Sequence, residues 1–307
     1  MATSDGPPNA RASTSSRRTW AWRLGGVAVS IIALVVVFSS VDVAEAWDVL
    51  ARASMPWLLA VFGVLLVQFT IRGWRWRTIL PPRPDGQPIP VVRTIPPLLV
   101  GYLGNAVLPA RLGEPIRAFL IARREQLDAL VSFGATMLER LVDTVTLALV
   151  GFVAAVALGA EWWIVALAAA VGFGGLIALG LLVAVGATRL ADIAARVTSR
   201  IGLADRIGKL LGWARAFATG VDRGRDVGRL LRVMGASVVS WLLDATIIFL
   251  VARSLGVELD YASAVIIAAV AVLATAVPAA PGYVGTFELA ATSAAVALGV
   301  LRAEGLA

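Results

Sequence analysis

The architecture of this chain follows from the stretch GYLGNAVLPARLGEPIR, residues 101–117. The apolar sequence around it is too short to cross a bilayer twice, because each helical crossing takes about 20 apolar residues. Five residues interrupt any continuous helix here: Pro96, Pro97, Pro109, Gly113 and Pro115. We therefore expect a re-entrant hairpin with Asn105, Pro109 and Gly113 at its tip. Because uncovered backbone at membrane depth must be surrounded by protein or water, the tip near Arg111 should line a cavity.

A second interrupted stretch, AVPAAPGYVGTFE at residues 276–288, repeats the skeleton of the first. In both stretches Ala-Val precedes the pattern Pro-x-x-x-Gly, and an acidic residue follows within three positions. Interrupted segments in the two halves of a chain indicate an inverted-repeat transporter. We expect the second tip to contain Pro281, Gly282, Tyr283 and Gly285.

The composition is that of a membrane protein. Hydrophobic residues make up 59% of the 307 positions and charged residues only 15%, against roughly 25% charged in soluble domains. The basic excess, 27 Lys plus Arg against 20 Asp plus Glu, is not gathered on a soluble module, so no nucleic-acid partner is expected. The absence of Cys and His excludes disulfides, Cys or His metal sites and His-based catalysis. We expect an all-α, polytopic integral membrane helix bundle without metal or cofactor.

Apolar runs locate the membrane spans at 24–41, 56–71, 129–158, 163–186, 233–251 and a broken region from 261 to 301. Trp residues lie near the ends of these runs, as an aromatic belt would place them: Trp20, Trp22, Trp47, Trp57, Trp74, Trp76, Trp162 and Trp163. Residues 1–19, rich in Ser, Pro, Ala and Arg, are expected to form a disordered cytoplasmic tail. Residues 20–307 are expected to form one polytopic membrane domain.

Loop charges set the orientation, because Lys and Arg are retained in the cytoplasm. The first 23 residues carry four Arg against Asp5, residues 42–55 carry three acidic residues against one Arg, and residues 72–93 carry five Arg against one Asp. We therefore expect the N-terminus and residues 72–93 in the cytoplasm of a bacterium, with the chain in the inner membrane. A cleaved signal peptide is the alternative at the N-terminus, but an apolar run of 18 residues favours a retained anchor.

Residues 187–232 are expected to be a cytoplasmic amphipathic connection, with ten basic residues against four acidic ones. Apolar residues recur in it at roughly helical spacing: Leu190, Ile193, Val197, Ile201, Ile207, Leu210 and Leu211. Such a helix lies on the inner leaflet with its Arg residues toward water and anionic headgroups. A solvated connecting helix without lipid contact is the alternative.

The run 129–158 carries Glu139, Arg140 and Asp143 roughly 15 to 20 Å from its start, at 1.5 Å per helical residue. A charge at that depth costs about 2.5–3.5 kcal/mol, so these groups must face protein or water. Glu139 and Asp143 share one helix face, and Arg140 lies three residues before Asp143. One interpretation is an Arg140–Asp143 salt bridge that only locks helices together.

The functional interpretation is a polar path for a lipid headgroup, lined by Arg111, Glu114, Arg117, Glu139, Arg140, Asp143, Asp244 and Glu288. Three of these residues are basic and five are acidic, an excess that suits a cationic or zwitterionic headgroup if all are ionised. Arg can hold a phosphate by a bidentate contact. Carboxylates that are protonated in low dielectric would instead be proton-coupling sites. For Asp244, a buried hydrogen bond to Ser or Thr is the alternative.

Three segments carry a family resemblance: Gly101–Arg124, Met137–Asp143 and Pro281–Glu288. In this order they resemble the lysylphosphatidylglycerol synthase transmembrane family, also called flippase-like proteins, over residues 20–307. The resemblance implies an activity like that of the flippase portion of multiple peptide resistance factor proteins, which translocates aminoacylated phospholipids. No aminoacyltransferase domain accompanies it, so the synthase activity is not implied. Members usually continue beyond the position of residue 307 into another apolar helix, which is the pattern of a C-terminal truncation.

We expect a translocator of a membrane lipid or a lipid-linked substrate, in which rocking of the two halves exposes the polar path alternately. No nucleotide-binding motif Gly-x-x-x-x-Gly-Lys-Ser/Thr occurs. The expected partners are membrane lipids, namely an aminoacylated or anionic phospholipid or a polyprenyl-linked substrate, and a second copy of the chain is a further candidate. The alternatives are an intramembrane enzyme acting on a polyprenyl or phospholipid substrate, with Glu114, Glu139 or Asp143 as base, and an accessory membrane subunit.

Overall fold

Helices form the regular structure of the computed structural model, which describes residues 47, 51–108, 111–157, 159, 162–200, 204–274 and 285–300. In chain order they are α3 (Met55–Ile79), α4 (Val91–Val107), α5 (Gly113–Glu125), α6 (Ala129–Ala157), α7 (Trp162–Val185), α8 (Ala187–Arg200), α9 (Ala204–Val221), the 3-10 helix η1 (Asp222–Arg225), α10 (Val227–Ser254), α11 (Tyr261–Ala274) and α12 (Thr286–Ala297). No strand occurs within the described ranges, which confirms the all-α class. The expected tail 1–19, most of the first tip's Pro-containing turn and the span 24–41 lie outside them, as do Pro109, Pro281, Gly282 and Tyr283.

Four of the described helices are long and apolar enough to cross a membrane, namely α3, α6, α7 and α10. They correspond to four of the expected runs, which confirms a multi-pass membrane protein. The expected end of α3 at residue 71 is wrong, because the helix continues to Ile79. No helix breaker intervenes before Pro81, and Leu80 takes the extended conformation that a following proline favours.

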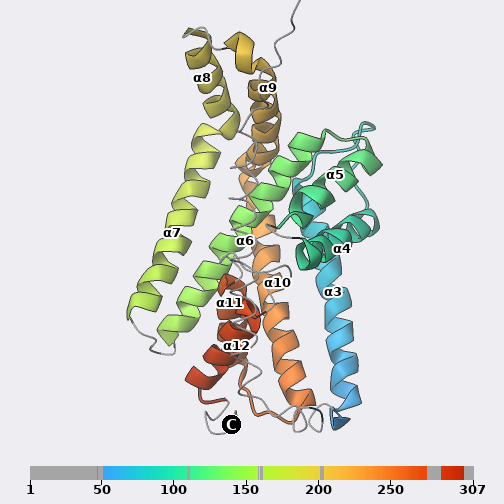
Figure 1. The fold of residues 1–307 in the computed structure, drawn as a ribbon, viewed down its shortest axis with the longest axis vertical. Helices are drawn as coiled ribbons and strands as arrows, with labels where there is room; N and C mark the ends of the chain where they lie inside the picture. Colours follow the sequence, from blue (N-terminus) through green and yellow to red (C-terminus); the bar gives the residue numbers. More distant parts are fainter. Residues whose placement is uncertain are drawn as a thin grey trace, which may run out of the picture.

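The long helices run along the long axis of the molecule (Figure 1). α10 packs against α3 and α11, and α6 packs against α7, α9 and α5. The short helices α4 and α5 lie beside α3 in the half of the molecule that carries α8 and α9, whereas α11 and α12 lie in the other half (Figure 1).

The α4–α5 pair is held together by close backbone approach. Gly113 lies so near α4 that an added Cβ would sit 1.9 Å from the carbonyl oxygen of Gly101, and a Cβ on Gly104 would sit 2.9 Å from the Gly113 Cα. Asn105 adds two hydrogen bonds across the pair. Its Oδ1 accepts from the Gly113 backbone N–H at 2.9 Å, and its Nδ2 donates to Glu114 at 3.3 Å. The expected tip residues Asn105 and Gly113 therefore join the two helices where the chain turns back.

The second expected tip lies between α11 and α12. α11 ends at Ala274 and α12 begins at Thr286, so the apolar region 261–301 is broken as expected. Gly285 precedes α12 with a φ of 91°, a left-handed conformation that favours glycine. The two helices pack on each other, and buried residues of both belong to one small apolar cluster.

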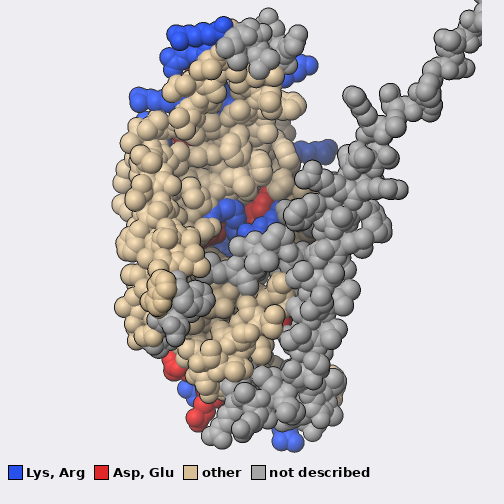
Figure 2. All heavy atoms as spheres, turned by 60° about the vertical axis from the view of Figure 1, so that its left-hand side comes forward, with Lys and Arg blue, Asp and Glu red and all other residues tan. Residues whose placement is uncertain are grey.

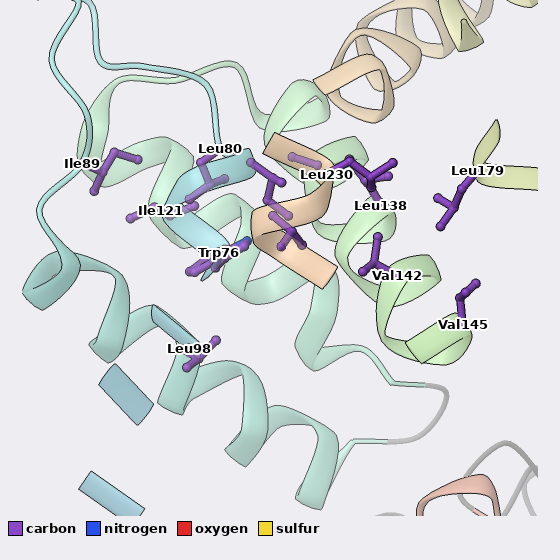
Figure 3. Packing of buried hydrophobic residues seen from close by; sticks show 13 residues of the cluster. Trp76, Leu80, Ile89, Leu98, Ile121, Leu138, Val142, Val145, Leu179 and Leu230 are labelled. Carbon is purple, nitrogen blue, oxygen red and sulfur yellow. The ribbon is translucent and has the colours of Figure 1, made fainter. Parts of the chain in front are cut away.

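The main apolar core gathers residues from α3, α4, α5, α6, α7 and α10, including Trp76, Leu98, Ile121, Leu138, Val142, Leu179 and Leu230 (Figure 3). The expected place of Trp76 in an aromatic belt is wrong, because its side chain is 0% exposed. Its indole Nε1 donates to the Thr136 hydroxyl at 3.2 Å. Trp57 and Trp162 are exposed near helix ends, as a belt position requires.

The segment η1 ties the ends of three helices together. Asp222 accepts hydrogen bonds from the first backbone N–H groups of α8. Arg223 donates to the carbonyl oxygens of Ile79 and Leu80 at the end of α3, at 3.1 and 3.0 Å, and Arg225 donates to a carbonyl oxygen of α7 at 3.3 Å. These are the backbone groups that helix termini leave without intrahelical partners.

The connection expected over 187–232 divides into two parts. α9 is a packed element of the bundle, because added Cβ atoms on Gly134 of α6 and Gly220 of α9 would each sit 2.0 Å from a carbonyl oxygen of the other helix. α8 instead exposes Leu190, Ile193 and Val197. Lys and Arg side chains gather at this end of the molecule (Figure 2).

Candidate functional site

Six charged side chains from α3, α5 and α6 converge between the helices, and we call them the charged network: Arg75, Glu114, Arg117, Glu139, Arg140 and Asp143. Five of the six side chains are at most 8% exposed. Five had been expected from the sequence as site residues; Arg75 had not. The spacing that puts Glu139 and Asp143 on one face of α6 is what presents both carboxylates to α3.

Arg75 is the centre of the charged network. Its Nε donates to Glu139 Oε1 at 3.1 Å, and its Nη2 donates to Asp143 Oδ2 at 3.1 Å. A closer bond joins Nη1 to the other oxygen of Asp143. Nη1 also donates to the Ser237 hydroxyl of α10 at 2.9 Å, and that hydroxyl donates to Asp143 at 3.0 Å. One guanidinium of α3 therefore connects α6 and α10.

Arg117 brings α5 into the same network. Its Nη2 donates to Glu139 Oε2 at 2.8 Å, and its Nε donates to Glu114 Oε2 at 2.8 Å. The guanidinium carbon lies 4.8 Å from the centre of the Trp76 ring, within the range of a cation–π contact. Glu139 thus receives one guanidinium on each of its two oxygens, which is how a fully buried carboxylate is compensated.

Arg140 makes only long contacts with the same carboxylates. The nearest oxygens lie at 3.5 Å for Glu114, 3.9 Å for Glu139 and 3.4 Å for Asp143. Its side chain is 26% exposed. The Arg140–Asp143 salt bridge expected as a possible lock is therefore present as a long contact, and the short bonds to Asp143 come from Arg75.

A second polar group lies one turn along α3. Arg72 Nη2 donates to Asp244 Oδ2 of α10 at 2.6 Å, and its Nη1 donates to the Tyr102 hydroxyl of α4. Gln68 donates to the other oxygen of Asp244. The alternative partner for Asp244, a Ser or Thr, is replaced by this ion pair with α3.

Two expected site residues lie apart from this arrangement. Arg111 is exposed in the turn before α5 and has a φ of 54°. Glu288 accepts a hydrogen bond from the backbone N–H of Gly285 at 2.6 Å, so it caps the start of its own helix. Within the described ranges no ion pair joins Glu288 to the charged network.

The expected excess of acid is wrong. It rested on three basic and five acidic residues, and the structure adds Arg72 and Arg75, which makes five of each. Both had been counted with a cytoplasmic loop, because positional charge counting treats every Arg after an apolar run alike. The available signal was their spacing: positions three apart lie on one face of a continuing helix.

A narrow crevice borders the network, lined by Leu98, Gly101, Tyr102, Asn105, Glu114 and Arg117. It is too narrow to admit a water molecule in this conformation. On one face of the molecule, charged side chains reach the surface at mid-height and are surrounded mainly by uncharged residues (Figure 2). Within the described ranges no three carboxylates are placed to hold a metal ion.

Comparisons with known proteins agree with this arrangement of apolar helices and buried charge. A family model described as the lysylphosphatidylglycerol synthase TM region matches residues 23–307. Among curated proteins, Glycosyltransferase AglD of Haloferax volcanii is 26% identical to this chain over 318 residues, covering 90% of the chain and 50% of that protein. The chain therefore spans half the length of this relative. No solved structure matches it.

Proposed function

This chain belongs to the lysylphosphatidylglycerol synthase transmembrane family, and from that premise we propose that it moves a membrane lipid or lipid-linked substrate across the bilayer. The headgroup passes beside the charged network while the acyl or polyprenyl chains stay in lipid. The observation that carries the proposal is the network itself: three guanidinium groups and three carboxylates held between apolar helices. Such groups are costly at membrane depth and mark substrate or ion pathways.

The two short helix pairs supply the moving parts. α4 and α5 turn back toward the network from one half of the molecule, and α11 and α12 turn back from the other half (Figure 1). This placement supports two re-entrant hairpins related by an inverted repeat, in which alternating access comes from rocking one half against the other. The narrow crevice between α4 and α5 fits an occluded conformation, which opens when the α4–α5 pair moves.

The proposed orientation puts the α8–α9 end and the N-terminus in the cytoplasm, in a bacterial inner membrane. The test uses single Cys residues, which are informative because the chain has none. Lys209→Cys lies on exposed α9 and Glu258→Cys in the exposed connection after α10. An impermeant thiol reagent applied to intact cells should label position 258 and spare position 209. The reverse pattern would overturn the orientation.

Lipid movement is tested with the full chain in proteoliposomes that contain a headgroup-labelled phospholipid and an impermeant quencher outside. The unmodified chain should expose inner-leaflet lipid to the quencher. Glu139→Gln keeps the shape of the side chain but removes the carboxylate that joins Arg75 and Arg117, so it should slow this exposure. Arg189→Gln, on the exposed surface of α8, is the matched control. Quenching at the level of protein-free liposomes with the unmodified chain would contradict the proposal.

A second candidate is an enzyme acting on a lipid-linked sugar or phospholipid, favoured by the name of the Haloferax relative. Glu114, Glu139 and Asp143 are the candidate bases. Each is within 4 Å of guanidinium groups, and ionised partners keep a carboxylate charged and weakly basic. Chemical analysis of the lipids after incubation separates the two functions, because a translocator returns its substrate unchanged.

A further inference from the structure

The three guanidinium groups of the charged network differ in what they hold. Arg75 and Arg117 each make several bonds of 3.1 Å or shorter to carboxylates and have side chains 2% and 3% exposed. Arg140 approaches no carboxylate oxygen of the described residues closer than 3.4 Å, and its side chain is 26% exposed. Arg75 and Arg117 therefore fasten helices, whereas Arg140 keeps bonding capacity on the accessible side.

Unused donors confirm the difference in capacity. Among the described residues, Arg140 Nε is a buried nitrogen without a hydrogen-bond acceptor, and so is Arg117 Nη1 beside the crevice. Buried polar groups are normally paired, so orphaned donors point to a partner that binds there. Arg117 Nη1 is partly accounted for by the Trp76 ring. Arg140 has no comparable ring contact within the described ranges.

We propose that Arg140 binds the phosphate group of the substrate, so that the substrate is a phosphate-bearing lipid. A guanidinium presents paired N–H groups in a planar fork that matches two phosphate oxygens. The proposal rests on the translocator function and assigns the residue that recognises the headgroup.

Neighbouring charges allow an anion at this position. Glu114, Glu139 and Asp143 are each within hydrogen-bond distance of Arg75 or Arg117, so their charges are compensated without Arg140. The first turn of α5 also lies here, since Glu114 is 3.5 Å from Arg140, and no side chain caps that helix. The partial positive charge of a helix N-terminus adds to the field at the anion.

The test measures binding apart from lipid movement. The full chain is extracted in mild detergent and incubated with phosphatidylglycerol or with dioleoylglycerol, which has no phosphate, and the retained lipid is counted by native mass spectrometry. Arg140→Gln removes the charge, and Arg140→Lys keeps the charge but loses the fork. Arg189→Gln on α8 is the control. Inorganic phosphate is added as a competitor in a parallel series.

We expect the unmodified chain and Arg189→Gln to retain phosphatidylglycerol in preference to dioleoylglycerol. Arg140→Gln should weaken that binding about 10- to 100-fold, the range for lost hydrogen bonds to a charged group, and Arg140→Lys by less. Both variants should elute as the unmodified chain does in size-exclusion chromatography, because no carboxylate depends on Arg140 for its short bonds.

Equal retention of phosphatidylglycerol by Arg140→Gln and the unmodified chain would overturn the assignment, even if lipid movement is normal. Efficient displacement of the lipid by millimolar phosphate would instead assign the site to a soluble phosphate and count against a lipid headgroup. If phosphatidylglycerol binds through Arg140 but does not move in proteoliposomes, this inference stands and the translocator proposal fails.

Discussion

Replacing Arg75 with Met should destabilise the protein more than any other single change in the charged network. Met has a similar length and no charge, so the variant leaves Asp143 in a buried setting with only the Ser237 hydroxyl at 3.0 Å and the long Arg140 contact at 3.4 Å. Glu139 keeps its bond to Arg117 at 2.8 Å. Removing one partner of a buried ion pair costs about 3–5 kcal/mol, because the remaining charge is uncompensated.

The matched controls separate charge from packing. Arg140→Met removes the same groups from a side chain that is 26% exposed and makes no short bond, so its cost should be smaller. The double variant Arg75→Met with Asp143→Asn removes the orphaned charge as well, and should recover about 1–3 kcal/mol of the loss.

Unfolding by sodium dodecyl sulfate in mixed micelles, followed by Trp fluorescence, gives the free energies for all three variants. Equal losses for Arg75→Met and Arg140→Met would refute the assignment of Arg75 as the central partner. A double variant less stable than Arg75→Met would show that Asp143 is stabilised by something other than Arg75.

Three further outcomes are expected from the same titration. Gly113→Ala should destabilise by about 1–3 kcal/mol, because its Cβ would meet a backbone oxygen at 1.9 Å and overpacking forces helices apart; Gly174→Ala, with open space around it, should be neutral or gain up to about 1 kcal/mol of helix propensity, and equal effects would contradict the close approach. Arg223→Ala should cost roughly 1–3 kcal/mol by releasing two carbonyls at the end of α3, and no loss would show that water satisfies them. Hydrogen bonds from Ser263 lower the pKa of Asp260, so its contribution is present above the ordinary carboxyl pKa and lost as pH falls through the lowered folded-state pKa; Asp260→Asn should flatten that acid-side decline, and an unchanged pH profile would exclude the contribution.

Hydropathy and helix-breaking residues were enough to predict the helices. The runs that became α6, α7 and α10 were visible because a lipid-facing helix must be apolar over its whole length, whatever it packs against. The breaks between α4 and α5 and between α11 and α12 were visible because Pro and Gly act on their own backbone. The helical spacing of Glu139 and Asp143 predicted a shared face for the same local reason.

The sequence by itself therefore determined that the chain is a helical membrane protein of this family, and that α6 carries charge in its interior. Only the tertiary structure decided which cation meets those carboxylates. Arg75 lies 64 and 68 positions from Glu139 and Asp143, and its bond to Ser237 spans 162 positions. Arg140, the nearest cation in the sequence, makes the longer contacts, because helix packing and not chain distance sets which side chains lie within bonding range.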